Sequence, residues 1–177
     1  MSDYIKYEVK VYKNGDKYWY KNGKLHRIDG PAMEFANGDK FWYKEHGLHR
    51  EDGPALEYAN GTKYWYKEGK YHREDGPAIE YANGDKIWCK NGKYHRIDGP
   101  AVELAHGTKF WYKEGKCHRV DGPACEYANG DKAWYLNDKK YSEAEFKKEI
   151  AKNSKAPCEG KIVEIDGKKY SLTSVTE

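Results

Sequence analysis

A short motif, His-Arg-x-Asp-Gly-Pro-Ala, recurs five times and carries the residue types that could do chemistry. Its basic residues are His26, His49, His72, His95 and His118, and Arg27, Arg50, Arg73, Arg96 and Arg119. All five arginines of the chain lie in this motif, whereas its 27 lysines are spread widely. A position that needed only positive charge would accept lysine, so this position requires the planar, multi-donor guanidinium group.

The guanidinium group could act in two ways. In the first, each arginine stacks on a tryptophan and bonds the aspartate two residues later or a backbone carbonyl, which makes the motif a structural clasp. In the second, arginine and histidine donors line a groove that binds an anionic partner, such as a nucleotide or an acidic protein surface. We favour the clasp and keep the groove as the alternative.

The repetition argues against an enzyme. Acid-base catalysis needs one pair of groups whose pKa values are moved apart, and five equivalent His–Asp sets do not provide that asymmetry. Equivalent histidines on successive repeats would lie about 10 Å apart, too far to share an ion. We therefore predict no catalytic residues, metal or cofactor. His95 and His106, with Cys89 and Cys117, form the only cluster that deserves inspection for a metal.

The composition indicates a core built from aromatic rings. Leu, Ile, Val and Phe together make up only 24 of the 177 residues, while Tyr and Trp contribute 17 and 6. Large rings must therefore supply most of the buried surface. The chain has no apolar run long enough to cross a membrane and does not open on a secretion signal, so we expect a cytoplasmic protein with reduced thiols.

The charge balance argues against nucleic-acid binding. Basic residues number 32 and acidic residues 29, giving a net charge of +3. Tracking a phosphate backbone requires a groove of one sign. We expect the partner to be a protein, with a homo-oligomer as a further possibility.

The motif belongs to a 23-residue repeat, which is marked by Trp19, Trp42, Trp65, Trp88, Trp111 and Trp134. The unit reads NGKxHRxDGPAxEYANGDKxWYK. Full copies begin at residues 22, 45, 68, 91 and 114. Near-identical units of this length cannot enclose one asymmetric centre, so they should stack and bury their apolar faces on their neighbours.

Within a unit, period-two alternation and glycine punctuation predict strands. The segments 32–36 and 40–44 flank Asn37-Gly38, which is typical of a hairpin. We expect a three-residue loop, 36–38, with its glycine in the left-handed region, because a two-residue turn would mix apolar and charged positions on one face.

This loop sets the register of the hairpin. Glu34 should face Lys40, and Ala32 should face Trp42, where the small side chain leaves room for the indole. One face then carries the large apolar residues Met33, Phe35, Phe41 and Tyr43. The remaining link, residues 22–31, ends in Gly-Pro, which cannot continue a central strand, so we predict two strands per unit.

The fold class is therefore all-β: an elongated antiparallel meander of hairpin units over residues 1–141, followed by a C-terminal cap over residues 142–177. Ser142 and Glu145 match a capping box and predict a helix over 143–152. Residues 161–173 alternate around Asp166-Gly167 and predict a terminal hairpin. The cap should cover the last open sheet edge.

The repeated unit resembles the MORN repeat family. The resemblance covers residues 9–141 and lies in the NGK-x-H segment, the A-[ND]-G hairpin loop and the K-[YF]-x-[WY] strand. The HRxDGPA form is similar to arrays encoded by bacteriophages and large DNA viruses, often labelled MORN-like or antitoxin-like. The resemblance implies a non-catalytic β-meander that serves as a binding scaffold. A viral origin would imply an inhibitor that blocks a host defence protein in the host cytoplasm.

We accordingly expect a protein-binding scaffold that acts by steric occlusion. The alternatives are a sponge for a small anionic nucleotide-type signal and an antitoxin-like partner protein. The candidate partner-binding residues are of types that dominate interfaces. They are Trp42, Trp65, Trp88, Trp111, Arg50, Arg73, Arg96, His49, His72, His95, Tyr66 and Tyr112.

Overall fold

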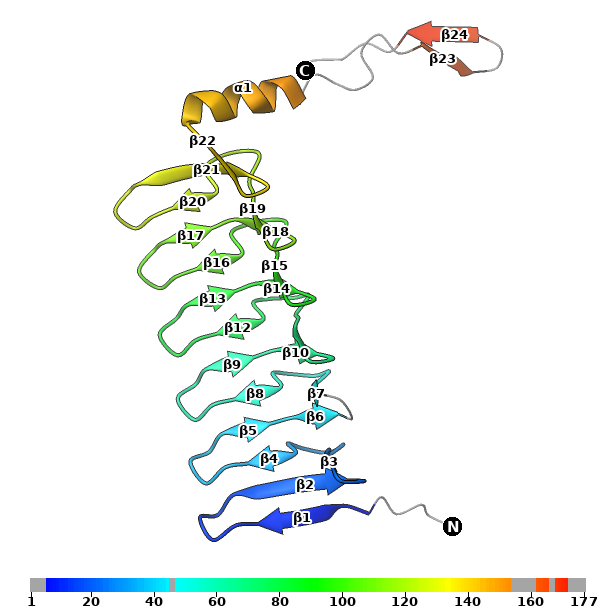
Figure 1. Cartoon of the computed structure of the whole chain (residues 1–177), viewed down its shortest axis with the longest axis vertical. Helices are drawn as coiled ribbons and strands as arrows, with labels where there is room; N and C mark the ends of the chain where they lie inside the picture. The colour runs from blue at the N-terminus through cyan, green and yellow to red at the C-terminus, as the bar shows by residue number, and fades with distance from the viewer. Residues whose placement is uncertain (1–5, 45–46, 154–161, 166–167, 172–177) are drawn as a thin grey trace.

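The chain forms an elongated stack of β-hairpins that ends in one helix (Figure 1). The structure is a computed structural model that describes residues 6–44, 47–153, 162–165 and 168–171. The predicted all-β meander is confirmed.

A fourteen-stranded antiparallel sheet runs the length of the stack, and its strand order follows the chain. Each unit between the two ends contributes two strands to this sheet, as predicted. The strands are β1 (Glu8–Val11), β2 (Lys17–Lys21), β3 (Lys24–Leu25), β4 (Met33–Glu34), β5 (Lys40–Phe41), β8 (Leu56–Glu57), β9 (Lys63–Tyr64), β12 (Ile79–Glu80), β13 (Lys86–Ile87), β16 (Val102–Glu103), β17 (Lys109–Phe110), β20 (Cys125–Glu126), β21 (Lys132–Leu136) and β22 (Lys139–Tyr141).

The predicted hairpin loop and the pairing of Glu34 with Lys40 are confirmed, while the pairing of Ala32 with Trp42 stays a prediction. The N–H of Gly38 donates to the carbonyl of Phe35 at 2.9 Å, and Gly38 has φ 96°, in the region that favours glycine. Glu34 pairs with Lys40, and Met33 pairs with Phe41. Lysine and glutamate therefore alternate across one face of the sheet.

Each inner unit also forms a second, short hairpin, which the sequence did not predict. These hairpins form a separate column beside the sheet (Figure 1). They are β6 (Tyr43–Lys44) with β7 (Gly47–Leu48), β10 (Tyr66–Lys67) with β11 (Lys70–Tyr71), β14 (Cys89–Lys90) with β15 (Lys93–Tyr94), and β18 (Tyr112–Lys113) with β19 (Lys116–Cys117). An inner unit thus has four strands rather than two.

The second hairpin forms because the long strand predicted over 40–44 breaks at Trp42. The N–H of Trp42 donates to Ala55 of the next unit, while its carbonyl accepts from His49. If the strand continued past Trp42, its next residue would face Pro54. Proline has no N–H and cannot donate a hydrogen bond to it. The chain after Trp42 therefore leaves the sheet and pairs with the segment that follows it. Tyr43 accordingly belongs to the hairpin column.

Small and aromatic side chains share the core, which lies between the sheet and the hairpin column. The alanine of each Gly-Pro-Ala segment is fully buried: Ala32, Ala55, Ala78, Ala101 and Ala124. Aromatic rings pack edge to face along the sheet, with centroids 5.0 Å apart for Phe35 and Phe41 and 5.4 Å apart for Phe41 and Tyr58. The rings supply much of the buried surface, as the composition indicates.

The helix α1 (Glu143–Asn153) closes the C-terminal end of the array. The N–H of Ser142 donates to Glu145 at 2.8 Å, and the Ser142 hydroxyl accepts from the Glu145 N–H at 3.3 Å, so the predicted capping box forms. Phe146 is buried, and α1 packs on β21 and β22. Within the described residues, α1 is the only helix, and it is neither long nor apolar enough to cross a membrane.

The predicted terminal hairpin is present as β23 (Ile162–Ile165) and β24 (Lys168–Ser171), which pair antiparallel. The residues that connect it to α1, 154–161, and its turn, 166–167, lie outside the described residues, so its part in capping stays a prediction.

Candidate functional site

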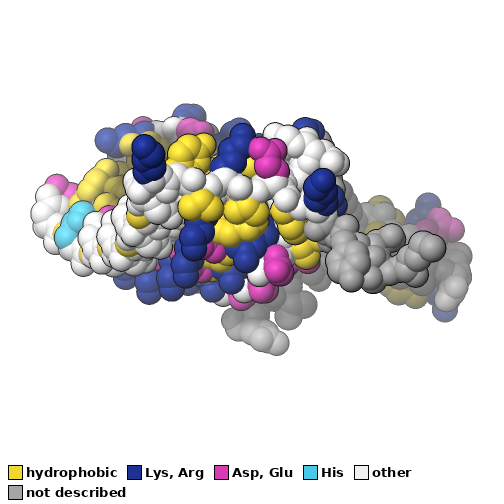
Figure 2. Space-filling view, turned by 90° about the horizontal axis from the view of Figure 1, so that it is seen from below, with side chains coloured by type: hydrophobic (Ala, Val, Ile, Leu, Met, Phe, Trp, Pro, Cys, Tyr) yellow, Lys and Arg dark blue, Asp and Glu magenta, His cyan; other side chains and the backbone are white. Residues whose placement is uncertain are grey.

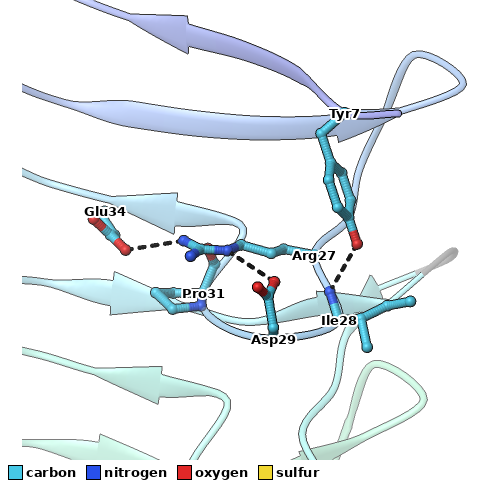
Figure 3. Close-up of polar contacts among 6 residues, drawn as sticks. All are labelled: Tyr7, Arg27, Ile28, Asp29, Pro31 and Glu34. Atoms are coloured by element: carbon cyan, nitrogen blue, oxygen red, sulfur yellow. Dashed lines mark hydrogen bonds and ion pairs between the residues drawn. The ribbon is translucent and has the colours of Figure 1, made fainter. Parts of the chain in front are cut away.

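The predicted arginine clasp is present in every full unit, and Arg73 illustrates its geometry. Its guanidinium carbon lies 4.1 Å from the ring centroid of Trp65, a cation–π distance. Nε donates to Asp75 at 2.9 Å, and Nη1 donates to the Pro77 carbonyl at 3.2 Å. Nη1 also donates to Glu80 at 3.0 Å. Figure 3 shows the corresponding contacts of the first clasp, with Arg27 bonded to Asp29 and Glu34.

The five clasps are nearly identical. The guanidinium carbon lies 3.9–4.2 Å from the tryptophan ring in all of them. The distance from Nη1 to the glutamate is 2.8–3.1 Å, and that from Nε to the aspartate is 2.8–3.5 Å. The sequence predicted the tryptophan, the aspartate and the carbonyl. It did not predict the glutamate, which stands seven residues after the arginine.

Glycine forms the other wall of the clasp. A β-carbon at Gly76 would lie 2.9 Å from the Arg73 guanidinium carbon, and the same holds for Gly30, Gly53 and Gly99 in their units. The guanidinium group is therefore held between the indole and the glycine backbone. The glycine of the motif makes this close approach of the guanidinium group possible.

The histidine of the motif ties each unit to the next. His72 Nδ1 accepts the backbone N–H of Asn91 at 3.3 Å, and the equivalent bonds join His49 to Glu68 and His95 to Glu114. These N–H groups belong to hairpin turns, where Asn91 has φ 52°. In His49 and His95 this acceptor role at Nδ1 places the proton of the neutral ring on Nε2, whereas Nδ1 of His72 also lies 2.9 Å from Asn91 Oδ1, where its role depends on the tautomer.

The variable third position of the motif places a carboxylate beside the histidine Nε2 atom in two units. Nε2 of His49 lies 3.5 Å from Glu51, and Nε2 of His72 lies 3.5 Å from Glu74. Hydrogen bonding to Lys44 lowers the pKa of Glu51 the most, and hydrogen bonding to His49 lowers it further. The other units carry Ile28, Ile97 and Val120 at this position.

Exposed aspartates complete the clasps and are held ionised. Hydrogen bonds from the arginines lower the pKa of Asp52, Asp75 and Asp121. Their side chains remain 75–85 % exposed, so the negative charge of the clasp faces solvent while the positive charge is largely covered. The arginine side chains are only 20–23 % exposed.

Half-open clefts lie between successive motifs. Their volumes are about 680, 910 and 460 Å³ for the first, second and third neighbouring pairs. The largest is lined by Trp65, Lys67 and His72 together with Asp52 and Asp75. Each arginine in these walls already bonds two acidic side chains, so the guanidinium groups offer little uncompensated positive charge to an anion.

The structure places the predicted partner-binding residues mostly inside the clasps and between units. The four tryptophans each stack against an arginine: Trp42 against Arg50, Trp65 against Arg73, Trp88 against Arg96 and Trp111 against Arg119. His49, His72 and His95 bond the next unit. Tyr66 packs against Tyr71 in the hairpin column, and Tyr112 packs against Tyr94. Their role toward a partner stays a prediction.

The cluster inspected for a metal is dispersed. His95 bonds Glu114, and His106 bonds the Thr108 hydroxyl at 2.8 Å. Burial raises the pKa of Cys89 to about 11 and, with the neighbouring Cys125 at 3.8 Å, that of Cys117 to about 12. Across the described ranges, no group of three or more His, Cys, Asp or Glu residues is arranged to hold a metal ion.

The third position of the motif is exposed in every unit, and sequence reasoning missed it. Ile97 is 92 % exposed, Ile28 66 % and Val120 55 %, while the Glu51 and Glu74 side chains are 77 % and 81 % exposed. We call these five residues, Ile28, Glu51, Glu74, Ile97 and Val120, the ridge. The signal that could have found it was the mixture of apolar and acidic residues at one position of an otherwise constant motif.

Comparison with known proteins identifies no relative: no protein-family model matches the chain, and no match was found among curated proteins.

Proposed function

We propose that this protein is a non-catalytic protein-binding scaffold that presents the ridge to its partner. The observation that carries the proposal is the exposure of Ile97 and Val120 on loops whose neighbouring residues are fixed by clasps. A β-branched side chain on a rigid loop loses little conformational freedom when a partner binds. The burial of its apolar area is therefore offset by a smaller entropy cost than it would be on a flexible loop.

The ridge defines the kind of protein that would fit. Its apolar members stand at both ends, and Glu51 and Glu74 stand between them beside the exposed Asp52 and Asp75. A partner with basic side chains flanked by apolar ones matches this order. The resemblance to virus-encoded arrays supports a host defence protein as the partner, blocked by steric occlusion, or a toxin for an antitoxin-like role.

The clasp geometry favours this scaffold over the nucleotide sponge. A sponge would need guanidinium groups free to meet phosphate, whereas Arg73 is bonded by Asp75, Glu80 and a carbonyl. Displacing these acceptors would cost charge-assisted hydrogen bonds before any ligand bond formed.

The test is a pull-down from host lysate with the wild-type chain, an Ile97→Asp/Val120→Asp variant and a Glu51→Lys/Glu74→Lys variant. The control is Lys13→Asp, an exposed position in the first hairpin loop. A partner retained by the wild type and the control but lost with both ridge variants supports the proposal. Retention by all four chains would overturn it.

Calorimetry with a panel of cyclic and linear nucleotides separates the two functions. The scaffold predicts no heat of binding from the panel. Saturable nucleotide binding that is lost in an Arg73→Ala variant would favour the sponge and count against the scaffold.

A further inference from the structure

The first strand of the array has a free edge. Among the described residues, β1 stands at the end of the sheet and pairs with β2 alone, whereas the opposite end of the array is covered by α1. Figure 2 looks onto the β1 end and shows hydrophobic side chains lying between clusters of positive and negative ones. An uncovered edge of this kind is a template for pairing with another strand.

The hydrogen-bond pattern identifies which backbone groups face outward. The N–H of Tyr12 donates inward to Asp16, and the N–H of Trp19 donates to Ala32 on the far side of β2. Trp19 faces Val9, so Val9 sits at a non-hydrogen-bonded position of the β1–β2 pair. By this alternation, the N–H and C=O groups of Tyr7, Val9 and Val11 point away from β2.

The side chains of β1 are self-complementary. The strand reads Glu-Val-Lys-Val, and both charged side chains are more than half exposed, with the Glu8 and Lys10 groups 3.4 Å apart. Val9 is 48 % and Val11 67 % exposed. Reversing the strand about Val9 exchanges Glu8 with Lys10, so an antiparallel copy offers the opposite charge at each position.

We propose that β1 pairs with β1 of a second copy of this chain about a twofold axis through Val9. In this register Val9 faces Val9 and Glu8 faces Lys10 twice, while the outward backbone groups of residues 7, 9 and 11 meet those of 11, 9 and 7. A register centred on Lys10 keeps the outward backbone groups paired but places Lys10 opposite Lys10, so two like charges meet. A register centred on Val11 would leave Glu8 without a lysine.

The dimer joins two arrays into one continuous sheet and then stops, because the second end of each array is covered by α1. A contact of one strand with itself is isologous and closes as a pair. The pairing uses β1, whereas Ile97 and Val120 of the ridge lie in the fourth and fifth repeats, so dimerisation and partner binding can fail independently.

The test is sedimentation equilibrium over a series of rising concentrations with four charge variants. The wild type is expected to dimerise. Glu8→Lys alone and Lys10→Glu alone each place like charges opposite one another twice, and should dimerise about tenfold more weakly. The two single variants mixed together should form a heterodimer, and the Glu8→Lys/Lys10→Glu double variant should recover the wild-type affinity.

Lys13→Glu is the matched control, since it changes the net charge by the same amount outside the paired strand. Circular dichroism establishes that each variant keeps the array folded. A wild type that stays monomeric throughout, single variants that dimerise as the wild type does, or a mixture no better than its components would overturn the proposal.

Discussion

The side chain of Arg73 occupies the space that a β-carbon at position 76 would need, because that atom would lie 2.9 Å from the guanidinium carbon. The indole of Trp65 closes the opposite side at 4.1 Å. The place of the Arg73 guanidinium group on Trp65 thus depends on glycine three residues later. The same relationship recurs in the other full units, which explains why both residue types recur in every full unit.

Gly76→Ala should destabilise the array by about 1–3 kcal/mol, because the added methyl group displaces the guanidinium group from Trp65 and its acceptors. In an Arg73→Lys background the same substitution should cost less than half as much, since the flexible lysine leaves room. Chemical denaturation of the four chains in a double-mutant cycle measures the coupling. Equal costs in both backgrounds would contradict this explanation of the glycine.

Arg73→Lys should lower the free energy of unfolding by about 1–3 kcal/mol even though the charge is kept. An ammonium group cannot stack flat on Trp65 while bonding Asp75 and Glu80. Lys13→Arg, at an exposed loop position, serves as the control and should be neutral. Thermal denaturation compares the melting temperatures of the wild type and the two variants. An unchanged melting curve for Arg73→Lys would show that the clasp does not stabilise the array.

Asp39→Ala should destabilise the array by about 1 kcal/mol more than Asp131→Ala. Both aspartates bond the asparagine of their own loop, but only Asp39 also accepts the N–H of Ala59 in the next unit, at 2.7 Å. Asp131 occupies the same position in the last full unit, which is not followed by another repeat. Similar losses for the two variants would show that the link between units contributes nothing.

The clasps should lose stability in acid. Hydrogen bonding to Arg73 lowers the pKa of Asp75 in the folded chain. Its contribution is therefore complete above the unfolded value of about 3.9 and disappears as the pH falls through the lower folded value. The stability difference between wild type and Asp75→Asn should accordingly be largest near neutral pH and shrink as the pH falls below about 4.

Asp98→Asn is the control for this pH series. Oδ1 of Asp98 lies 3.5 Å from Nε of Arg96, whereas Oδ1 of Asp75 lies 2.9 Å from Nε of Arg73. Its variant should show a smaller pH-dependent difference. Urea denaturation at a series of pH values provides the measurement. A constant difference for Asp75→Asn down to the acid limit contradicts the prediction.

The thiols of Cys89 and Cys117 should resist alkylation at pH 8 while the protein is folded. Burial raises the pKa of these thiols to about 11 and about 12, so the reactive thiolate is scarce and shielded. Peptide mapping by mass spectrometry after iodoacetamide treatment should find both cysteines modified only in denaturant. Modification in the native state at the rate of a free thiol would show that the core opens readily.

Much of the local structure could be predicted because it depends on residues close in the chain. Asn37-Gly38 and the alternation around it determine the loop and the pairing of Glu34 with Lys40. The clasp of Arg73 with Asp75 and Trp65 was predictable from the restriction of arginine to one position. The capping box of Ser142 and Glu145 was predictable from its spacing.

The sequence by itself determined the 23-residue period, the all-β stack, the loop geometry and the residue types of the arginine clasp, since each follows from residues that recur at a fixed spacing. Only the tertiary structure decided that the chain leaves the sheet at Trp42, that His72 bonds the turn at Asn91, and that Ile97 points into solvent. These depend on where the next unit lies, and its position is set by the packing of aromatic rings and glycine-lined clasps that no single unit contains.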